Sequence, residues 1–274
     1  MNSDISPDDA ELALLPETGT GALGLSLFRR LAAEALGTAL LIVAVIGSGI
    51  MATNLSADIG LQLLENAAAT GAALIGLILM FGAVSGAHFN PVVTLTDRFL
   101  GTTSTSDTIL YVIAQVFGAC CGTVLANLMF SLPAIEISTD VRSGGGLWLS
   151  EVIATVGLLL VIQGCVRTGR AAAVPFAVGA WIAGAYWFTS STSFANPAVT
   201  IARMFSDTFA GIAPSSVPMF ILMQLLGTVI AFGLIRFFYP HVTVAPHVTD
   251  SPSVTDASGN DASVTDSLGG PAHE

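Results

Sequence analysis

Asn followed by Pro occurs twice in this sequence, at Asn90-Pro91 and at Asn196-Pro197. Each pair lies near the end of a segment without charged residues, at 66–96 and 171–202, of 31 and 32 residues. One bilayer crossing takes about 20 apolar residues, so each segment is longer than one crossing. Asn is a strong N-cap residue and Pro is favoured at the first helical position. Each pair therefore predicts a short helix that begins inside a membrane.

Two helices that begin at the same depth can do chemistry at their N-termini. A non-helical backbone inside a membrane persists only where it is packed in protein or lines a wet cavity. Each N-terminus carries unpaired N–H groups and the positive end of the helix dipole. Facing one another, they raise a barrier to cations, while the amides of Asn90 and Asn196 donate to a passing oxygen atom. We therefore expect a pore. Asn-Pro as a mere turn signal is the alternative, and its duplication argues against it.

Two carboxylates and one histidine are further candidates. Glu34 and Glu151 lie in apolar segments, where an ionisable residue is functional by default. They either accept hydrogen bonds from the loops before the short helices or relay protons in a coupled carrier. The absence of a basic partner within the spans argues against the proton relay. His88, two residues before Asn90, is either a pore-lining group that reports pH or a hydrogen-bonded structural residue. The sequence shows no nucleophile–base set, phosphate loop or metal cluster, so we expect no enzyme, cofactor or metal.

Composition indicates that membrane-spanning helices must position these residues. The chain has 274 residues, 53% hydrophobic and 10% charged, with a mean hydropathy of +0.78, which is typical of an all-α integral membrane protein. The short helices are expected at 90–99 and 196–206. Six full spans are expected at 28–52, 63–84, 108–131, 147–166, 172–190 and 217–239.

Charge divides the chain into a membrane domain, at 28–239, and two tails. The net charge of −11 comes mostly from acids in residues 1–27 and 240–274, which we expect to be disordered. There is no basic footprint for nucleic acid. The absence of lysine suggests a GC-rich genome, and hence a bacterial inner membrane. The positive-inside rule places both termini in the cytoplasm, because one side carries most of the arginines: Arg29, Arg30, Arg98, Arg167, Arg170 and Arg236.

The two halves of the membrane domain resemble each other. Glu34 is matched by Glu151 after 117 residues, Asn90 by Asn196 after 106, and Gln115 by Gln224 after 109. The repeats cover about 28–131 and 147–239. Three spans per repeat is an odd number, so the second copy must be inverted in the membrane, with the shared site at the midplane. Pairs of small residues four apart, Gly118 with Gly122 and Gly179 with Ala183, favour close helix packing.

Gly86-Ala-His-Phe-Asn-Pro-Val-Val-Thr-Leu95 and Phe194-Ala-Asn-Pro-Ala-Val-Thr200, together with the paired glutamates, resemble the aquaporin (major intrinsic protein) family. The resemblance covers 28–239 and implies six spans and two re-entrant half-helices. It also implies a homotetramer with one pore per subunit, and a loop-supporting role for Glu34 and Glu151. The family's Asn-Pro-Ala motifs correspond to Asn90, Pro91 and Val92, and to Asn196, Pro197 and Ala198.

The constriction implied by the resemblance departs from that of water channels. Those carry Arg after the second motif, where this chain has Val199, and Arg203 follows one turn later. Family spacing gives Thr70, Gly184 and Ser193 as the other three filter positions. The sequence resembles a bacterial branch associated with arsenic-resistance operons. An uncharged filter of small residues predicts a passive channel for glycerol and other polyols, urea, arsenite or methylated arsenicals. A water-selective pore and a proton-coupled carrier that uses Glu34 and Glu151 are the alternatives.

Overall fold

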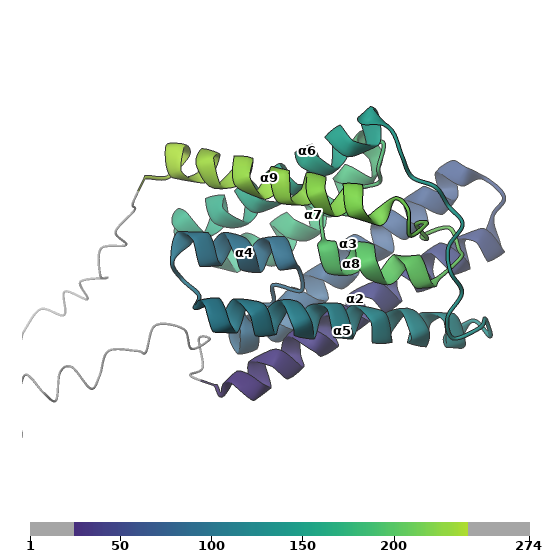
Figure 1. The fold of residues 1–274 in the computed structure, drawn as a ribbon, viewed down its shortest axis with the longest axis horizontal. Helices are drawn as coiled ribbons and strands as arrows, with labels where there is room; N and C mark the ends of the chain where they lie inside the picture. The colour runs from purple at the N-terminus through teal and green to yellow at the C-terminus, as the bar shows by residue number, and fades with distance from the viewer. Residues whose placement is uncertain (1–24, 241–274) are drawn as a thin grey trace, which may run out of the picture. The chain divides into compact units, whose positions relative to one another are not determined.

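The computed structural model describes residues 25–240, so most of the two predicted tails, 1–24 and 241–274, lies outside the described residues. The described part is helical (Figure 1). Six helical segments are long and apolar enough to cross a membrane, which confirms the predicted fold class. They are α2 (Leu27–Leu55), α3 (Ile59–Ser85), α5 (Thr105–Met129), α6 (Gly145–Arg167), η1 with α7 (Ala171–Ala173, Val174–Phe188) and α9 (Val217–Phe238).

Two shorter helices begin at the Asn-Pro pairs. Helix α4 spans Pro91–Leu100, and α8 spans Pro197–Ala202 and continues as the 3-10 turn η2, Arg203–Phe205. The N-caps are Asn90 and Asn196, and each Pro takes the first helical position. This agrees with the local preferences of both residue types.

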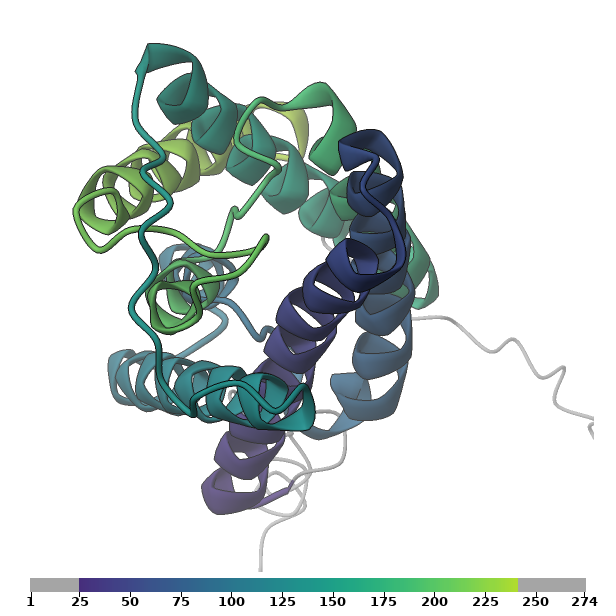
Figure 2. The same ribbon diagram turned by 90° about the vertical axis from the view of Figure 1, so that its right-hand side faces the viewer.

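The helices form two groups with the same internal packing (Figures 1 and 2). In the first half, α2 packs against both α3 and α5, and in the second half α6 packs against α7 and α9. Helices α3 and α7 join the two halves, and α4 also contacts α8. The start of α2 and the end of α9 lie on one side, here called the terminal face. The turn at 56–58 and the segment 130–144 lie on the opposite side, the distal face.

Small residues permit the closest helix contacts. A Cβ atom at Gly118 would overlap the carbonyl oxygen of Ala35 in α2. A Cβ atom at Gly179 would lie 2.7 Å from the carbonyl oxygen of Gly71, across the junction of α3 and α7. Both pairs of small residues predicted from the sequence thus include a position where the backbones meet.

Candidate functional site

The two half-helices are tied together through their capping asparagines. Asn90 Nδ2 donates to the carbonyl oxygen of Ala195, and Asn196 Nδ2 donates to the carbonyl oxygen of Phe89, both at 2.8 Å. Each Oδ1 accepts a backbone N–H of its own helix, from Val92 at 3.0 Å in the first half and from Ala198 at 3.0 Å in the second. The asparagines therefore fix the two N-termini against each other.

The loop before each half-helix has an unusual backbone. Ala87 and Phe89 in the first loop have φ values of 50° and 49°, and Ser193 and Ala195 in the second have 53° and 45°. Such left-handed conformations are uncommon for residues other than glycine and persist where surrounding contacts hold them. The matching positions show that the two loops are built alike.

Glu34 holds the first loop. Its carboxylate is fully buried and accepts four hydrogen bonds. Oε1 accepts from Ser85 Oγ at 2.6 Å and from the backbone N–H of His88 at 3.0 Å. Oε2 accepts from the backbone N–H of Phe89 at 2.7 Å and from Gln115 Nε2 at 2.8 Å. The second hydrogen of this Gln115 amide reaches Thr94 in α4.

Glu151 repeats this arrangement around the second loop. Oε1 accepts from Ser191 Oγ at 2.6 Å and from the N–H of Phe194 at 2.9 Å. Oε2 accepts from the N–H of Ala195 at 2.9 Å and from Gln224 Nε2 at 2.7 Å. Sequence reasoning found both glutamates and the glutamine repeat but missed the two serines. The signal was available, since Ser85 and Ser191 each lie five residues before a capping asparagine.

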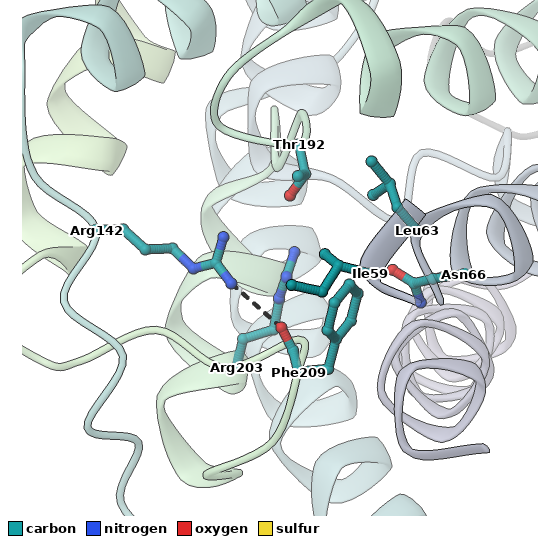
Figure 3. Close-up of a pocket in the computed structure, with 7 residues that line it drawn as sticks. All are labelled: Ile59, Leu63, Asn66, Arg142, Thr192, Arg203 and Phe209. Carbon is teal, nitrogen blue, oxygen red and sulfur yellow. Dashed lines mark hydrogen bonds between the residues drawn. The ribbon is translucent and has the colours of Figure 1, made fainter. Parts of the chain in front are cut away.

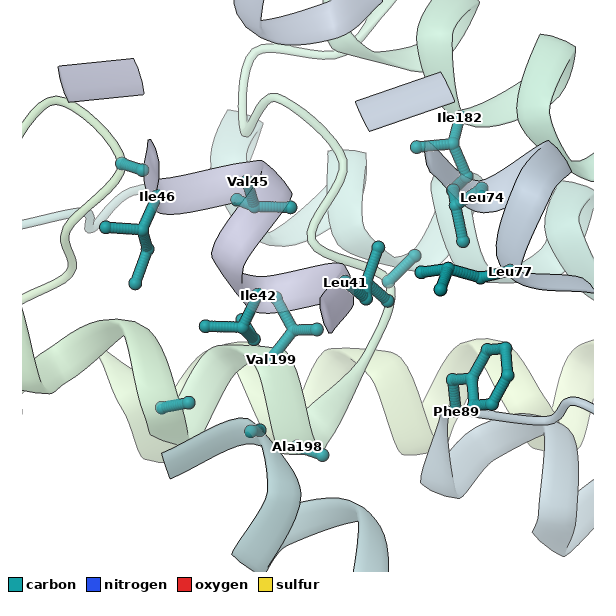
Figure 4. Packing of buried hydrophobic residues seen from close by; sticks show 14 of the residues in the cluster. Leu41, Ile42, Val45, Ile46, Leu74, Leu77, Phe89, Ile182, Ala198 and Val199 are labelled. Atoms are coloured by element: carbon teal, nitrogen blue, oxygen red, sulfur yellow. The ribbon is translucent and has the colours of Figure 1, made fainter. Parts of the chain in front are cut away.

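An apolar cluster meets the half-helices near their N-termini. Val199 is 5% exposed and packs with Ala198 in a cluster to which α2, α3 and α7 contribute. In Figure 4, Val199 lies beside Ile42 of α2. Val199 was expected to line the constriction, and this side chain brings no charge to its surroundings.

The predicted filter residues are only partly brought together. Thr70 is buried in α3, and its Oγ1 lies 3.3 Å from the hydroxyl of Tyr186 in α7. Ser193 is also buried, and its hydroxyl has no hydrogen-bond partner among the described residues. An unpaired hydroxyl of this kind suits a surface that a polar solute passes.

Gly184, expected in the filter from family spacing, does not lie on the face of α7 that meets Thr70, and its place in the filter stays a prediction. A Cβ atom at Gly184 would meet only the ring of Phe188, at 3.6 Å, and that ring is 56% exposed. Two residues along α7, Tyr186 is buried against Thr70 instead. The buried face of α7 runs through Val178, Ile182 and Tyr186. Gly184 lies on another face because two residues turn a helix by about 200°. Counting back from Asn196 carries no information on which face of α7 is buried.

His88 lies on the terminal-face side of the site and is held at both ring nitrogens. Nδ1 is 3.0 Å from Thr94 Oγ1, and Nε2 is 3.1 Å from the Asp97 carboxylate. Gln163 of α6 donates to the same carboxylate at 3.1 Å. These contacts favour the structural role over the free pore-lining one. Within residues 25–240, no group of three or more His, Cys, Asp or Glu side chains is arranged to hold a metal ion.

Comparisons with known proteins agree with this geometry. The family described as Major intrinsic protein matches residues 23–185 and 152–265. The chain is 53% identical over 210 residues to Aquaglyceroporin AqpS of Rhizobium meliloti, covering 77% of this chain and 90% of that protein. It is 31% identical over 166 residues to Aquaporin Z of Bradyrhizobium diazoefficiens, covering 55% and 68%.

A solved structure shows the same fold. The X-ray structure of the aquaglyceroporin from Plasmodium falciparum matches with a TM-score of 0.62 and 21% identity, covering 80% of this chain and 98% of that one. At this identity the likeness concerns the fold alone. The family match and the 53% identical relative show that the chain belongs to the major intrinsic protein family, whose members are membrane channels and not enzymes.

Proposed function

We propose that this protein is a passive channel for small uncharged solutes, namely glycerol and other polyols, arsenite or methylated arsenicals, with water as an accompanying solute. The observation that carries the proposal is Val199 at the place after the second Asn-Pro-Ala motif. A valine there adds neither the charge nor the length of the arginine that water channels of the family carry. The relative that is 53% identical bears the name aquaglyceroporin, which supports the same solute class.

The half-helices supply the features that such a channel needs. Their N-termini, capped by Asn90 and Asn196, present positive dipole ends that disfavour cations. A neutral polyhydroxy solute exchanges its hydrogen bonds with water for hydrogen bonds with polar groups along the path. The hydroxyls of Ser193 and Tyr186 are suitable partners beside Thr70. The apolar cluster with Val199 offers contact for the carbon atoms.

The hydrogen bonding of the glutamates argues against the carrier. Glu34 and Glu151 each accept four hydrogen bonds, two of them from backbone N–H groups. Protonation would make one oxygen a donor that faces other donors, which costs free energy. We infer that these carboxylates stay fixed and support the loops, as the resemblance to the family implies.

One observation favours a narrower, water-selective pore as the second candidate. Tyr186 lies beside Thr70, where the sequence alone suggested only small residues. A phenol ring takes up space in a constriction. One of the relatives also bears the name Aquaporin Z. Comparing permeabilities decides between the two.

We further propose a homotetramer in a bacterial inner membrane, with the terminal face in the cytoplasm. The arginine bias supports the orientation. Large apolar side chains such as Leu79, Phe117 and Trp187 are more than half exposed in the single chain, which leaves area for lipid and for neighbouring subunits. A detergent-corrected mass of four chains is expected in mild detergent, and a stable single chain would contradict the tetramer.

Stopped-flow light scattering on proteoliposomes tests the function. Vesicles with the protein should take up glycerol and arsenite faster than empty vesicles, and also shrink faster in a sucrose gradient. Collapsing the proton gradient with a protonophore should leave these rates unchanged. Water flux without glycerol or arsenite flux would favour the water-selective pore, and solute flux that needs the proton gradient would favour the carrier.

A further inference from the structure

A cavity on the distal face is lined by two arginines. Its volume is ≈ 190 Å³, and Arg142, Arg203, Thr192 and Asn66 supply its polar lining. Apolar walls come from Leu63 and two other side chains, Ile59 and Phe209. We call this space the distal cavity (Figure 3).

The distal cavity adjoins the constriction. Asn66 lies one helical turn before Thr70 in α3, Thr192 precedes Ser193, and Arg203 follows Val199 by four residues. Of these three polar lining residues, Thr192 is adjacent in the chain to a constriction residue, and Asn66 and Arg203 each lie one helical turn from one. A solute that enters from the distal face meets this cavity before it meets Val199.

Arg203 is buried without an acidic partner. The side chain is 2% exposed, and its guanidinium carbon lies 3.5 Å from the centroid of the Phe194 ring. Nε donates to the carbonyl oxygen of Ala210, and Arg203 forms no ion pair with a carboxylate anywhere in residues 25–240. Its terminal nitrogens point into the distal cavity in Figure 3. A buried charge without a partner is costly unless something compensates it.

Arg142 comes from the segment between the two halves and faces the same cavity. Nε donates to the carbonyl oxygen of Gly211 at 2.8 Å, and Nη2 lies 2.7 Å from the Asp140 carboxylate. Its guanidinium carbon is 5.4 Å from the Phe194 ring centroid, so both arginines share that ring. Two positive charges and one negative charge therefore leave a net charge of +1 at the cavity.

The equivalent position in the first half has the opposite charge. Arg203 follows Asn196 by seven residues, and Asp97 follows Asn90 by seven. The residue two before each asparagine is the partner in both cases, Phe194 for Arg203 and His88 for Asp97. Asp97 has a charged or polar partner on each oxygen, whereas the Arg203 terminal nitrogens have none among the described residues.

We propose that the distal cavity binds a small monovalent oxyanion, of the carboxylate or sulfonate class, between Arg142 and Arg203. One negative charge matches the net charge of +1. Guanidinium groups bind planar and tetrahedral oxyanions through charge-assisted, often paired hydrogen bonds. The Thr192 hydroxyl points toward the same place in Figure 3. The cavity volume of ≈ 190 Å³ has room for a small anion, and Leu63 and Phe209 suit a short apolar substituent.

An anion bound there obstructs the distal entrance of the constriction, so neutral solutes pass more slowly. This consequence rests on the proposed function, but the binding does not. Binding is therefore measured separately, by isothermal titration calorimetry of the purified full chain in detergent. Sodium methanesulfonate is the probe, because the acid is strong and has no neutral form that crosses a bilayer.

We expect saturable binding to the unmodified protein, and binding weaker by about tenfold or more in Arg203→Gln, which removes the charge and the paired donors. Arg98→Gln is the matched control: Arg98 is an exposed arginine at the end of α4, bonded to Thr105, and its loss should leave the affinity unchanged. If Arg203→Gln does not fold, Arg203→Lys keeps the buried charge without the planar fork and should also bind more weakly.

Equal affinity in the unmodified protein and the Arg203 variants, or no saturable heat with the unmodified protein, would overturn the site. Stopped-flow glycerol flux with methanesulfonate on both sides then tests the consequence. Flux should slow in the unmodified protein and in Arg98→Gln, but not in Arg203→Gln. Binding without slowing would overturn the obstruction alone. Absence of any glycerol flux would instead count against the proposed function and leave the binding result intact.

Discussion

Thr70 and Tyr186 meet across the junction of the two halves, with Oγ1 of Thr70 3.3 Å from the phenol oxygen. The contact joins α3 of the first half to α7 of the second, and Thr70 lies one turn along α3 from Asn66, which lines the distal cavity. It places a tyrosine where counting residues from Asn196 had placed Gly184. The constriction is therefore proposed to consist of Thr70, Tyr186, Ser193 and Val199.

Substitutions at positions 184 and 186 separate the two assignments. Gly184→Val should leave glycerol permeability unchanged, because a Cβ atom there meets only the exposed Phe188 ring. Tyr186→Trp should lower glycerol permeability strongly, because a larger ring fills the proposed constriction. Both are measured by stopped-flow light scattering at equal protein content in the vesicles. A strong loss in Gly184→Val with little change in Tyr186→Trp would restore the assignment from family spacing.

The glutamates are predicted to matter for stability more than for selectivity. Glu34→Gln and Glu151→Gln each turn an acceptor oxygen into a donor that faces other donors, which should cost about 1–3 kcal/mol of unfolding free energy. Thermal unfolding in detergent measures the loss, and Glu65→Gln, at a half-buried position in α3, serves as the control. The ratio of glycerol to water permeability should stay as it was. A stable variant that loses only pH-dependent uptake would support the carrier instead.

Close helix packing makes Gly118 sensitive to the smallest enlargement. Gly118→Ala should destabilise the protein by about 1–3 kcal/mol, because the new methyl group overlaps the Ala35 carbonyl oxygen. Gly76→Ala should be neutral or stabilising by up to about 1 kcal/mol, because no atom lies within 4 Å of its Cβ position. Comparing the two unfolding midpoints is the measurement. Equal midpoints would mean that α2 and α5 are not in such close contact.

The sequence predicted the features that depend on neighbouring residues, such as the helix N-caps, and missed the contacts that depend on how the helices are arranged in space. Asn90 and Asn196 could be predicted as N-caps because capping preference and the Pro that follows act within a few residues. Glu34 and Glu151 stood out because carboxylates are rare in apolar segments. Their serine and backbone partners lie 40 or more residues away, so the pairing required the fold.

The proposal of Tyr186 in place of Gly184 likewise depends on the fold. The stretch between α7 and Asn196 is irregular, and its length sets which face of α7 meets Thr70. A fixed spacing from the motif carries no information on which face of α7 is buried. The continuous buried face through Val178, Ile182 and Tyr186 is a better guide, because it follows the period of the helix itself.

Val199 is proposed to leave the constriction uncharged and open to solutes larger than water. Val199→Arg adds a long, positively charged side chain there, and in a low-dielectric channel that charge acts strongly on permeants. Val199→Met, which also lengthens the side chain but adds no charge, helps to separate the effect of charge from that of length. Both variants need matched protein levels in the membrane, since a buried unpaired arginine also threatens folding.

Stopped-flow measurement of glycerol and water permeability in vesicles containing each variant is the most direct test. The ratio of glycerol to water permeability should fall sharply in Val199→Arg and less in Val199→Met, with much of the water permeability retained in both. An unchanged ratio in well-folded Val199→Arg would contradict the account, because Val199 would then not line the constriction.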